Sequence, residues 1–390
     1  MQADFDDFLP IASNEAKASK SADVQVIFKA YSLGVSTNRD NIVYDHNFNE
    51  LKLRIESFID DYNFEVKRWI ASDKKVGVDS FVSYDKLKWS RNLKNELKRE
   101  NYTKYEDAAV RRSIYRPYTS MWLYSGDVLV DEHGTSVKYF PVTKSQPENS
   151  AIVIGGYGRK EFSILAVNLI PNLNFYADPA QCFPLYTYAV GGKIRRDNIT
   201  DWALGQFQAK YGPTVTKRDI FHYVYALLHH PEYRERYKEN LKRELPRLPL
   251  VADADGTVFQ TYVTVGAELA ALHVGYEDAA EYPLKQVVTK DVPLSWRVTK
   301  MRLSADKTAV KINDSLTLTG LPPEVFAYKL GNRSALEWVL DQFQVTTDKR
   351  SGLVSDPNRA DAPDYIARLV RRVVTVSVET QARVGRLPGL

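Results

Sequence analysis

The residue types that carry out catalysis are present in this sequence, but they form no complete catalytic motif. The glycine-rich run at 154–160 follows an apolar stretch, yet it lacks the GxxxxGK[ST] phosphate loop and matches GxGxxG only in part. The double proline Pro322-Pro323 has neither the leading Asn or Asp nor the trailing aromatic residue of an amine-methylating loop. No convincing copy of an Asp…Glu-x-Lys nuclease motif is present. We therefore expect no catalytic residue in this chain.

Histidine and cysteine spacing does not predict a metal site. His222, His229 and His230 fall outside the i, i+3 and i, i+4 spacings of helical metal ligands, so we expect surface or helix-capping roles. Cys182 is the only cysteine and has no histidine nearby in the sequence, which predicts an inert, buried thiol. A single cysteine also excludes an internal disulfide and fits a reducing cytoplasm.

Basic residues in predicted loops remain as candidates for binding a ligand. Loop-borne Arg, Lys, Asn and Thr side chains are those that hold phosphates and read base edges in DNA. Solvated loops also carry charge without any ligand, so each single cluster keeps this simpler interpretation. The candidate DNA-binding residues are Thr37, Asn38, Arg39, Arg116, Tyr118, Lys144, Arg159, Lys160, Lys193, Arg195, Arg196, Lys217, Arg218, Lys349 and Arg350.

Two of these clusters are flanked by glycine, which favours turns that project side chains into a DNA groove. They contain Arg159 and Lys160, at a predicted hairpin tip, and Lys193, Arg195 and Arg196. Arginine can bind guanine O6 and N7 together, whereas lysine acts mainly as a point charge on phosphate. We expect at least one of the three arginines to read a base.

The overall composition limits the kinds of protein in which these clusters can occur. The chain has 390 residues, 44% of them hydrophobic and 26% charged, which predicts two or three compact units with a sizeable core. The net charge of +4 is too small for a protein that coats DNA, so nucleic-acid binding must come from local clusters. No apolar run reaches the roughly 18 residues of a membrane span, and the N-terminus does not resemble a signal peptide. We therefore expect a cytoplasmic protein with no membrane partner.

Hydrophobic periodicity predicts an α+β chain, with a mixed, sheet-rich middle flanked by helical segments. Helices are expected over 49–70, capped by Asp45 or Asn47, and over 85–100, 216–243 with a second start at Pro231, 259–275, 323–343 and 363–381. The valines at 373–378 leave open a strand at the start of the last helix. Strands are expected at 24–28, 121–124, 137–142, 150–154 and 162–168, with an antiparallel hairpin over 296–318.

The order of several phrases resembles the C-terminal region of the type ISP restriction–modification enzymes. The resemblance covers about 20–380. The phrases are IFKAYSLGVSTNRD at 27–40, YRPY at 115–118, QCFPLY at 181–186, DIFHYVYALL at 219–228, PEYR at 231–234, ALEW at 335–338, QVTTDKRSGLVSDPN at 344–358 and RRVVTVSVET at 371–380.

This resemblance implies a division of labour. In that family a nuclease, a helicase-like translocase and an adenine methyltransferase precede a target recognition domain. The chain would then contain the tail of the methyltransferase region with a helical spacer (1–108), a DNA target recognition domain (109–300) and a C-terminal hairpin with helices packed on it (301–390). S-adenosylmethionine, ATP and Mg would be cofactors of the upstream domains only.

The function implied is sequence-specific recognition of double-stranded DNA, next to methyltransferase and helicase-like domains of the same enzyme. The sequence leaves open whether the chain is an excised fragment or a separate subunit. The alternative is a non-catalytic scaffold that couples a translocase to a methyltransferase. An independent enzyme is disfavoured by the missing motifs.

Overall fold

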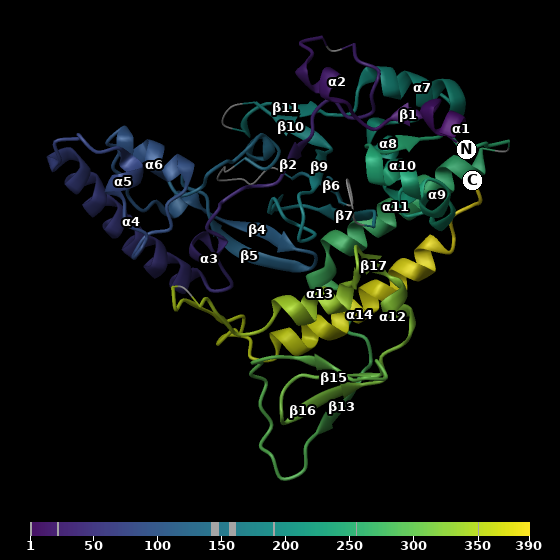
Figure 1. Ribbon diagram of the computed structural model, residues 1–390. Helices are drawn as coiled ribbons and strands as arrows, with labels where there is room; N and C mark the ends of the chain where they lie inside the picture. The colour runs from purple at the N-terminus through teal and green to yellow at the C-terminus, as the bar shows by residue number, and fades with distance from the viewer. Residues whose placement is uncertain are drawn as a thin grey trace.

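The centre of the molecule is a sheet of strand order β2–β9–β6–β7, surrounded by helices and further sheets, two of which are four-stranded (Figure 1). The computed structural model describes residues 2–21, 23–141, 148–155, 161–189, 192–254, 256–349 and 351–390. The predicted α+β class is confirmed, because helices and strands are interspersed through the described residues.

The helices are α1 (Gln2–Asp6), α2 (Asn14–Ala18), α3 (Asp40–Val43), α4 (Phe48–Ala71), α5 (Val78–Phe81), α6 (Arg91–Lys98), α7 (Asp201–Tyr211), α8 (Lys217–Leu227), α9 (Pro231–Arg236), α10 (Lys238–Arg243), α11 (Thr257–Val274), α12 (Glu324–Ala327), α13 (Ala335–Gln342) and α14 (Tyr365–Val384). The strands are β1 (Leu9–Pro10), β2 (Ser32–Leu33), β3 (Tyr44–Asp45), β4 (Val110–Arg116), β5 (Thr119–Tyr124), β6 (Ala151–Gly155), β7 (Ser163–Val167), β8 (Ile170–Pro171), β9 (Gln181–Pro184), β10 (Tyr186–Tyr188), β11 (Arg195–Asp197), β12 (Arg247–Leu248), β13 (Lys285–Val288), β14 (Arg302–Leu303), β15 (Ala309–Lys311), β16 (Leu316–Thr319), β17 (Lys329–Leu330), β18 (Arg333–Ser334), β19 (Thr346–Thr347) and β20 (Val354–Ser355).

Both faces of the central sheet are buried. Side chains of a strand alternate between faces, and in β6 Ala151 and Val153 belong to one hydrophobic core while Ile152 and Ile154 belong to another. The first core also takes side chains from α4, α14 and the sheet of order β3–β5–β4–β8. The second core takes them from α7 to α11. A sheet buried on both faces explains why β6 and β7 are continuous apolar runs.

The second core depends on a close contact between α8 and α11. Gly266 of α11 lies so near α8 that a Cβ atom there would be 1.9 Å from the carbonyl oxygen of His222. Tyr225 of α8 anchors this helix pair to the sheet, since its hydroxyl accepts a hydrogen bond of 2.8 Å from the amide of Ala166 in β7. The glycine therefore sets the distance between the two helices.

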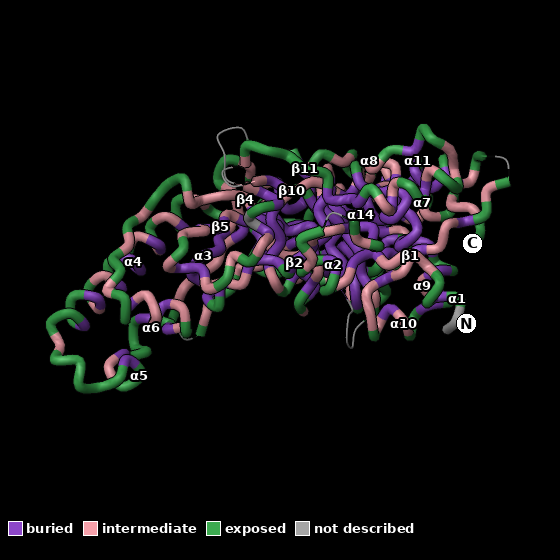
Figure 2. Tube along the Cα trace, turned by 90° about the horizontal axis from the view of Figure 1, so that it is seen from above, coloured by how far each residue is buried: buried purple, intermediate pink, exposed green. Residues whose placement is uncertain are grey.

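Helices α4 to α6 form an arm that projects from the body (Figures 1 and 2). Asn47 caps α4 by accepting hydrogen bonds from the amides of Asn49 and Glu50, and Ser90 caps α6 by accepting one from Leu93. The buried residues of α4 follow the predicted helical spacing, including Leu51, Ile55, Phe58, Ile59 and Tyr62. This amphipathic stripe packs the arm onto itself and onto the first core.

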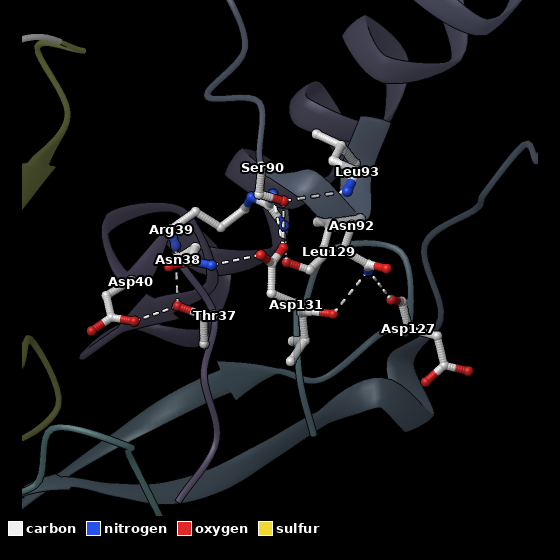
Figure 3. A network of polar contacts seen from close by, with 11 residues as sticks. Thr37, Asn38, Arg39, Asp40, Ser90, Asn92, Leu93, Asp127, Leu129 and Asp131 are labelled. Carbon is white, nitrogen blue, oxygen red and sulfur yellow. Dashed lines mark hydrogen bonds and ion pairs between the residues drawn. The ribbon is translucent and has the colours of Figure 1, made fainter. Parts of the chain in front are cut away.

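A buried arginine joins the arm to the body (Figure 3). The guanidinium of Arg39 donates to the carbonyl of Leu129, to the hydroxyl of Ser90 at 2.6 Å and to the carboxylate of Asp131 at 3.4 Å. Arg39 is fully buried and the Asp131 side chain is 8% exposed. Burial lowers the pKa of Arg39, and the charge of Asp131 partly offsets this. Three segments far apart in the sequence meet at this one charge.

Most predicted helices are confirmed, with changes at their ends. The helix at 49–70 is α4, the stretch at 216–243 is α8, α9 and α10 with Pro231 starting α9, and 259–275 is α11. The basic helix at 85–100 is shortened to α6, and 323–343 is divided into α12 and α13 by the β17–β18 turn, where Gly331 has φ of 72°. The predicted helix at 363–381 is α14, which begins at Tyr365, and its valines are helical because their packing against the first core outweighs their strand preference.

The predicted strands at 121–124, 150–154 and 162–168 are confirmed as β5, β6 and β7, and 296–318 contains β14, β15 and the start of β16. Two strand predictions are wrong. Residues 24–28 form only a bridge between Phe28 and Ile199, and the described part of 137–142 includes the end of a short 3-10 helix, Ser136–Lys138. The apolar run predicts a strand, but Ile27 and Phe28 pack into the second core from a segment that is not part of a sheet.

The two cores do not follow the boundaries predicted at 108 and 300. The first core combines residues on both sides of each boundary, from Val35 to Val376, and the second core begins at Phe5 and ends at Ala270. The three predicted segments are therefore interleaved in packing. Their assignment to methyltransferase tail, recognition domain and C-terminal support stays a prediction.

The contact at Gly266 predicts opposite effects for the same substitution in two helices. Gly266→Ala should lower the free energy of unfolding by about 1–3 kcal/mol, because the new methyl group meets backbone. Gly205→Ala in α7, where nothing lies within 4 Å of the new Cβ, should raise it by about 0.4–1 kcal/mol. Urea unfolding measures both, and equal effects would contradict the role of the α8–α11 contact.

The Arg39 network predicts a large loss of stability when its charge is removed. Arg39→Met leaves Asp131 buried without its cation, which should cost about 3–5 kcal/mol. The control is Arg68→Met on α4, where the arginine is 45% exposed and pairs with Glu65 on the surface, with an expected cost of about 0–1 kcal/mol. Thermal and urea unfolding compare the two. A cost for Arg39→Met no greater than for the control would show that the network does not hold the arm.

Candidate nucleic-acid interface

The structure brings two basic segments together around Tyr186. The guanidinium of Arg195 in β11 lies over the Tyr186 ring, 4.3 Å from its centre. Arg218, in the first turn of α8, donates a hydrogen bond of 3.4 Å to the Tyr186 hydroxyl. Lys193 and Arg196 are exposed next to Arg195. We call Tyr186, Lys193, Arg195, Arg196 and Arg218 the hairpin surface.

The hairpin of β10 and β11 is held firmly at its base. The side chain of Asn149, 4% exposed, donates to the carbonyl of Tyr186 at 2.9 Å and accepts from its amide at 3.1 Å. The side chain of Asn198, 2% exposed, donates to the carbonyls of Pro184 and Ala30, each at 2.8 Å. Buried amides with several partners fix the backbone. The base of the two-stranded hairpin is thus fixed to the body of the protein.

The charges of the hairpin surface differ in how far they are neutralised. Lys217 is paired with Asp201 at 2.6 Å and with Asp197 at 3.8 Å, so little of its charge is available. Within the described parts of the chain, the side chains of Lys193 and Arg196 have no ion pair or hydrogen bond. The hydrogen bond to Tyr186 raises the pKa of Arg218, which keeps it cationic. Four of the predicted cations, Lys193, Arg195, Arg196 and Arg218, therefore lie on or beside the β10–β11 hairpin with their charge available.

The structure places Thr37, Arg39 and Tyr118 in the interior, which corrects their choice as DNA contacts. Thr37 is 1% exposed and bonds to Asp40, and Tyr118 is fully buried with its hydroxyl 2.9 Å from that of Tyr328. Arg39 belongs to the network that joins the arm to the body. The polar groups of these three side chains form hydrogen bonds with groups inside the protein. They are therefore not accessible to DNA.

Asn38 lies at the surface, whereas Arg116 reaches it only in part. Asn38 is exposed, with φ of 54°, and its amide donates to Asp131 at 2.5 Å. Arg116 is half-buried, stacks on Tyr115 with 3.9 Å to the ring centre, and donates to Asn172 at 2.9 Å. Both side chains are committed to protein contacts, and as DNA contacts they stay predictions.

Other predicted residues lie away from the hairpin surface or outside the described residues. Lys349 is exposed beside β19, a strand that lines a cavity of about 320 Å³ together with α3. Lys144, Arg159, Lys160 and Arg350 lie outside the described residues.

Described residues that flank two of these segments have defined contacts. Glu148, which follows the segment of Lys144, accepts a hydrogen bond from the Tyr188 hydroxyl at 2.9 Å, next to the hairpin surface. Gly155 and Ser163, which flank the segment of Arg159, pair at one end of β6. The other end of β6, Ala151, pairs with Pro184 just before β10.

Sequence reasoning missed Tyr186, Asn149 and Asn198. Nothing local marks a tyrosine as the meeting point of two arginines, because Arg218 comes from another helix. A signal for the hairpin did exist, since Gly191-Gly192 separates two alternating runs that contain Tyr186 and Arg195. The asparagines act through contacts between distant segments, which leave no local pattern.

The described residues contain no group of three or more His, Cys, Asp or Glu side chains that could hold a metal ion. His230 caps α9 by accepting from the amide of Glu232, as expected, whereas His229 is buried. The predicted burial of Cys182 is confirmed, and burial raises the pKa of its thiol, as expected for an unreactive cysteine. Among the described residues, no helix is long and apolar enough to cross a membrane.

Comparison with solved structures gives strong matches to DNA-bound enzymes. A cryo-electron-microscopy structure of a DrdV–DNA complex is similar at a TM-score of 0.86 and 36% identity, over 99% of this chain and 38% of that one. A nuclease-deletion mutant of the Type ISP restriction-modification enzyme LlaGI, in complex with a DNA substrate mimic, gives 0.85 and 30%, over 99% and 34%. The ATP-dependent Type ISP enzyme LlaBIII bound to DNA gives 0.84 and 27%, over 99% and 24%.

The chain thus spans between about a quarter and two fifths of the length of these enzymes. No curated protein matches it. Residues 26–371 match the Type ISP C-terminal specificity domain, which covers most of the chain and agrees with the resemblance seen in the phrases. The chain therefore belongs to the family of Type ISP C-terminal specificity domains.

Proposed function

We propose that this chain recognises specific sequences in double-stranded DNA, as the specificity part of a type ISP restriction–modification enzyme. The observation that carries the proposal is the family match over residues 26–371. Similar chains of known structure were solved with DNA bound. The hairpin surface supplies the physical means, because a two-stranded ribbon fits the major groove and exposed cations neutralise phosphates.

Adenine methylation and DNA cleavage then belong to domains upstream of this region. We propose that S-adenosylmethionine, ATP and Mg bind there, and that the chain neither methylates nor cuts DNA on its own. Its partners are duplex DNA and the methyltransferase and helicase-like domains of the same enzyme, in the cytoplasm. The missing catalytic motifs support this division.

A non-catalytic scaffold is the second candidate, and one observation favours it. The arm exposes large apolar side chains, with Leu53 at 62% and Phe64 at 58% exposure. Such residues can dock a neighbouring domain. A scaffold without DNA recognition would have little affinity for duplexes at any salt concentration, which separates the two candidates.

Binding of the chain to duplex DNA should be modest and strongly dependent on salt. Each phosphate neutralised contributes a slope of about 0.9 in log K against log salt, so the four cations of the hairpin surface contribute at most about 3.6. A salt titration by fluorescence anisotropy measures the slope. Replacing Lys193, Arg195, Arg196 and Arg218 together by alanine should flatten it. No retention of duplexes at low salt would favour the scaffold.

Single substitutions should separate base contacts from phosphate contacts. Lys193→Ala should weaken binding to all duplexes alike and lower the salt slope by about one. Arg196→Ala should cost about 1–3 kcal/mol on preferred sequences and relax the preference at one position. Competition binding with a randomised duplex library gives both readouts. If alanine at Arg159, Arg195 and Arg196 changes neither preference nor affinity, base reading belongs to other residues.

A further inference from the structure

We propose that Ile194 contacts the 5-methyl group of a thymine in the major groove, beside a base that Arg196 reads. The proposal rests on the proposed function and assigns a chemical role to one face of the β10–β11 hairpin. Ile194 is an apolar side chain that is 56% exposed among three exposed cations, and it belongs to neither hydrophobic core.

Strand alternation divides the hairpin into two faces. The register pairs Tyr186 with Asp197, Thr187 with Arg196 and Tyr188 with Arg195. The pairing continues to the turn, since the amide of Ala189 donates to the carbonyl of Ile194 at 3.0 Å. Because side chains alternate along a strand, Thr187, Ala189, Ile194 and Arg196 share one face. Tyr186, Tyr188, Arg195 and Asp197 share the other.

The face with the tyrosines is used by the protein itself. Tyr188 is 6% exposed and its hydroxyl donates to the carbonyl of Glu148. Arg195 lies over the Tyr186 ring, and Asp197 faces Lys217 at 3.8 Å. This face is therefore largely committed to contacts within the protein, although Arg195 on it is exposed.

The opposite face remains accessible, and its chemistry suits base edges. Thr187 and Ala189 are partly exposed and Arg196 is exposed. In the major groove, arginine binds guanine, a hydroxyl can bond to several bases, and apolar groups contact the thymine methyl. We call Thr187, Ala189, Ile194 and Arg196 the reading face. Ile194 is its largest apolar side chain, and it lies at the end farthest from the anchored base of the hairpin.

The test removes the methyl group from the DNA. A duplex enriched from a randomised library by the chain is resynthesised with each thymine replaced in turn by deoxyuridine, which lacks only the 5-methyl group. One replacement should weaken binding of the unmodified chain about fourfold, as expected for one buried methyl group. Ile194→Ala should bind the thymine duplex about fourfold more weakly or worse, and should bind both duplexes equally. Val288→Ala, a control on β13 where the valine is 45% exposed, should keep the full discrimination.

Each outcome bears on a defined claim. An enriched duplex without thymine, or one in which no deoxyuridine affects the unmodified chain, overturns the role of Ile194 and leaves DNA recognition standing. A deoxyuridine effect that persists in Ile194→Ala assigns the methyl contact to another residue and also overturns it. Failure to enrich any duplex, with no retention at low salt, overturns the proposed function itself.

Discussion

The constraint on which the rest of the structure depends is the burial of both faces of the central sheet. Successive residues of β6 point into different cores, with Ile152 in the second and Val153 in the first. A shift of the strand by one residue would place each side chain in the core that is packed for the other. The register of this sheet therefore fixes the first and second cores together. It also fixes the hairpin surface, because β9 of the sheet leads through Leu185 directly into β10.

Buried polar groups act as joints between segments that are remote in sequence. Asn198, at the end of the hairpin, donates a hydrogen bond to the backbone at Ala30. Asn149, which lies just before β6, donates one to the backbone of Tyr186 at the start of the hairpin. Arg39 does the same for the arm, at the point where Ser90 caps α6 and the chain turns at Asp131. A buried polar group is costly unless its partners are in place, so each joint favours one arrangement. Recognition of a DNA sequence needs such rigidity, since base edges differ by the placement of a few atoms.

Side chains alternate along the strands of the hairpin as they do in the central sheet. One face of the hairpin therefore contacts the protein, and the other is the face that we propose for DNA. One face of β10 and β11 is occupied by tyrosines and by charges that pair within the protein. The other carries a hydroxyl, small and branched apolar groups and an arginine. The arm of α4 to α6 lies away from the hairpin (Figures 1 and 2), and its exposed apolar residues are the ones that we propose as a contact with another protein domain. The proposed base-reading face and the proposed docking surface therefore lie on different parts of the chain.

The sequence by itself determined the family and much of the local structure. The helical stripe of α4, the start of α9 at Pro231 and the apolar runs of β6 and β7 are all local patterns, which periodicity detects. The phrases shared with type ISP enzymes indicate the specificity region directly, because they are long and occur in a fixed order along the chain. The set of loop cations also contained most of the hairpin surface, because exposed arginine and lysine are easily recognised.

Only the tertiary structure decided which of those polar residues face solvent. Arg39, Thr37 and Tyr118 belong to loops or strand ends by sequence, yet they are buried, because segments distant in the chain close over them. The valines of α14 and the apolar run at 24–28 show the same effect on secondary structure, since both are set by packing against a core. Arg195 and Arg218 meet at Tyr186 for the same reason. Burial and convergence depend on contacts between distant residues, and these contacts leave no trace in local spacing.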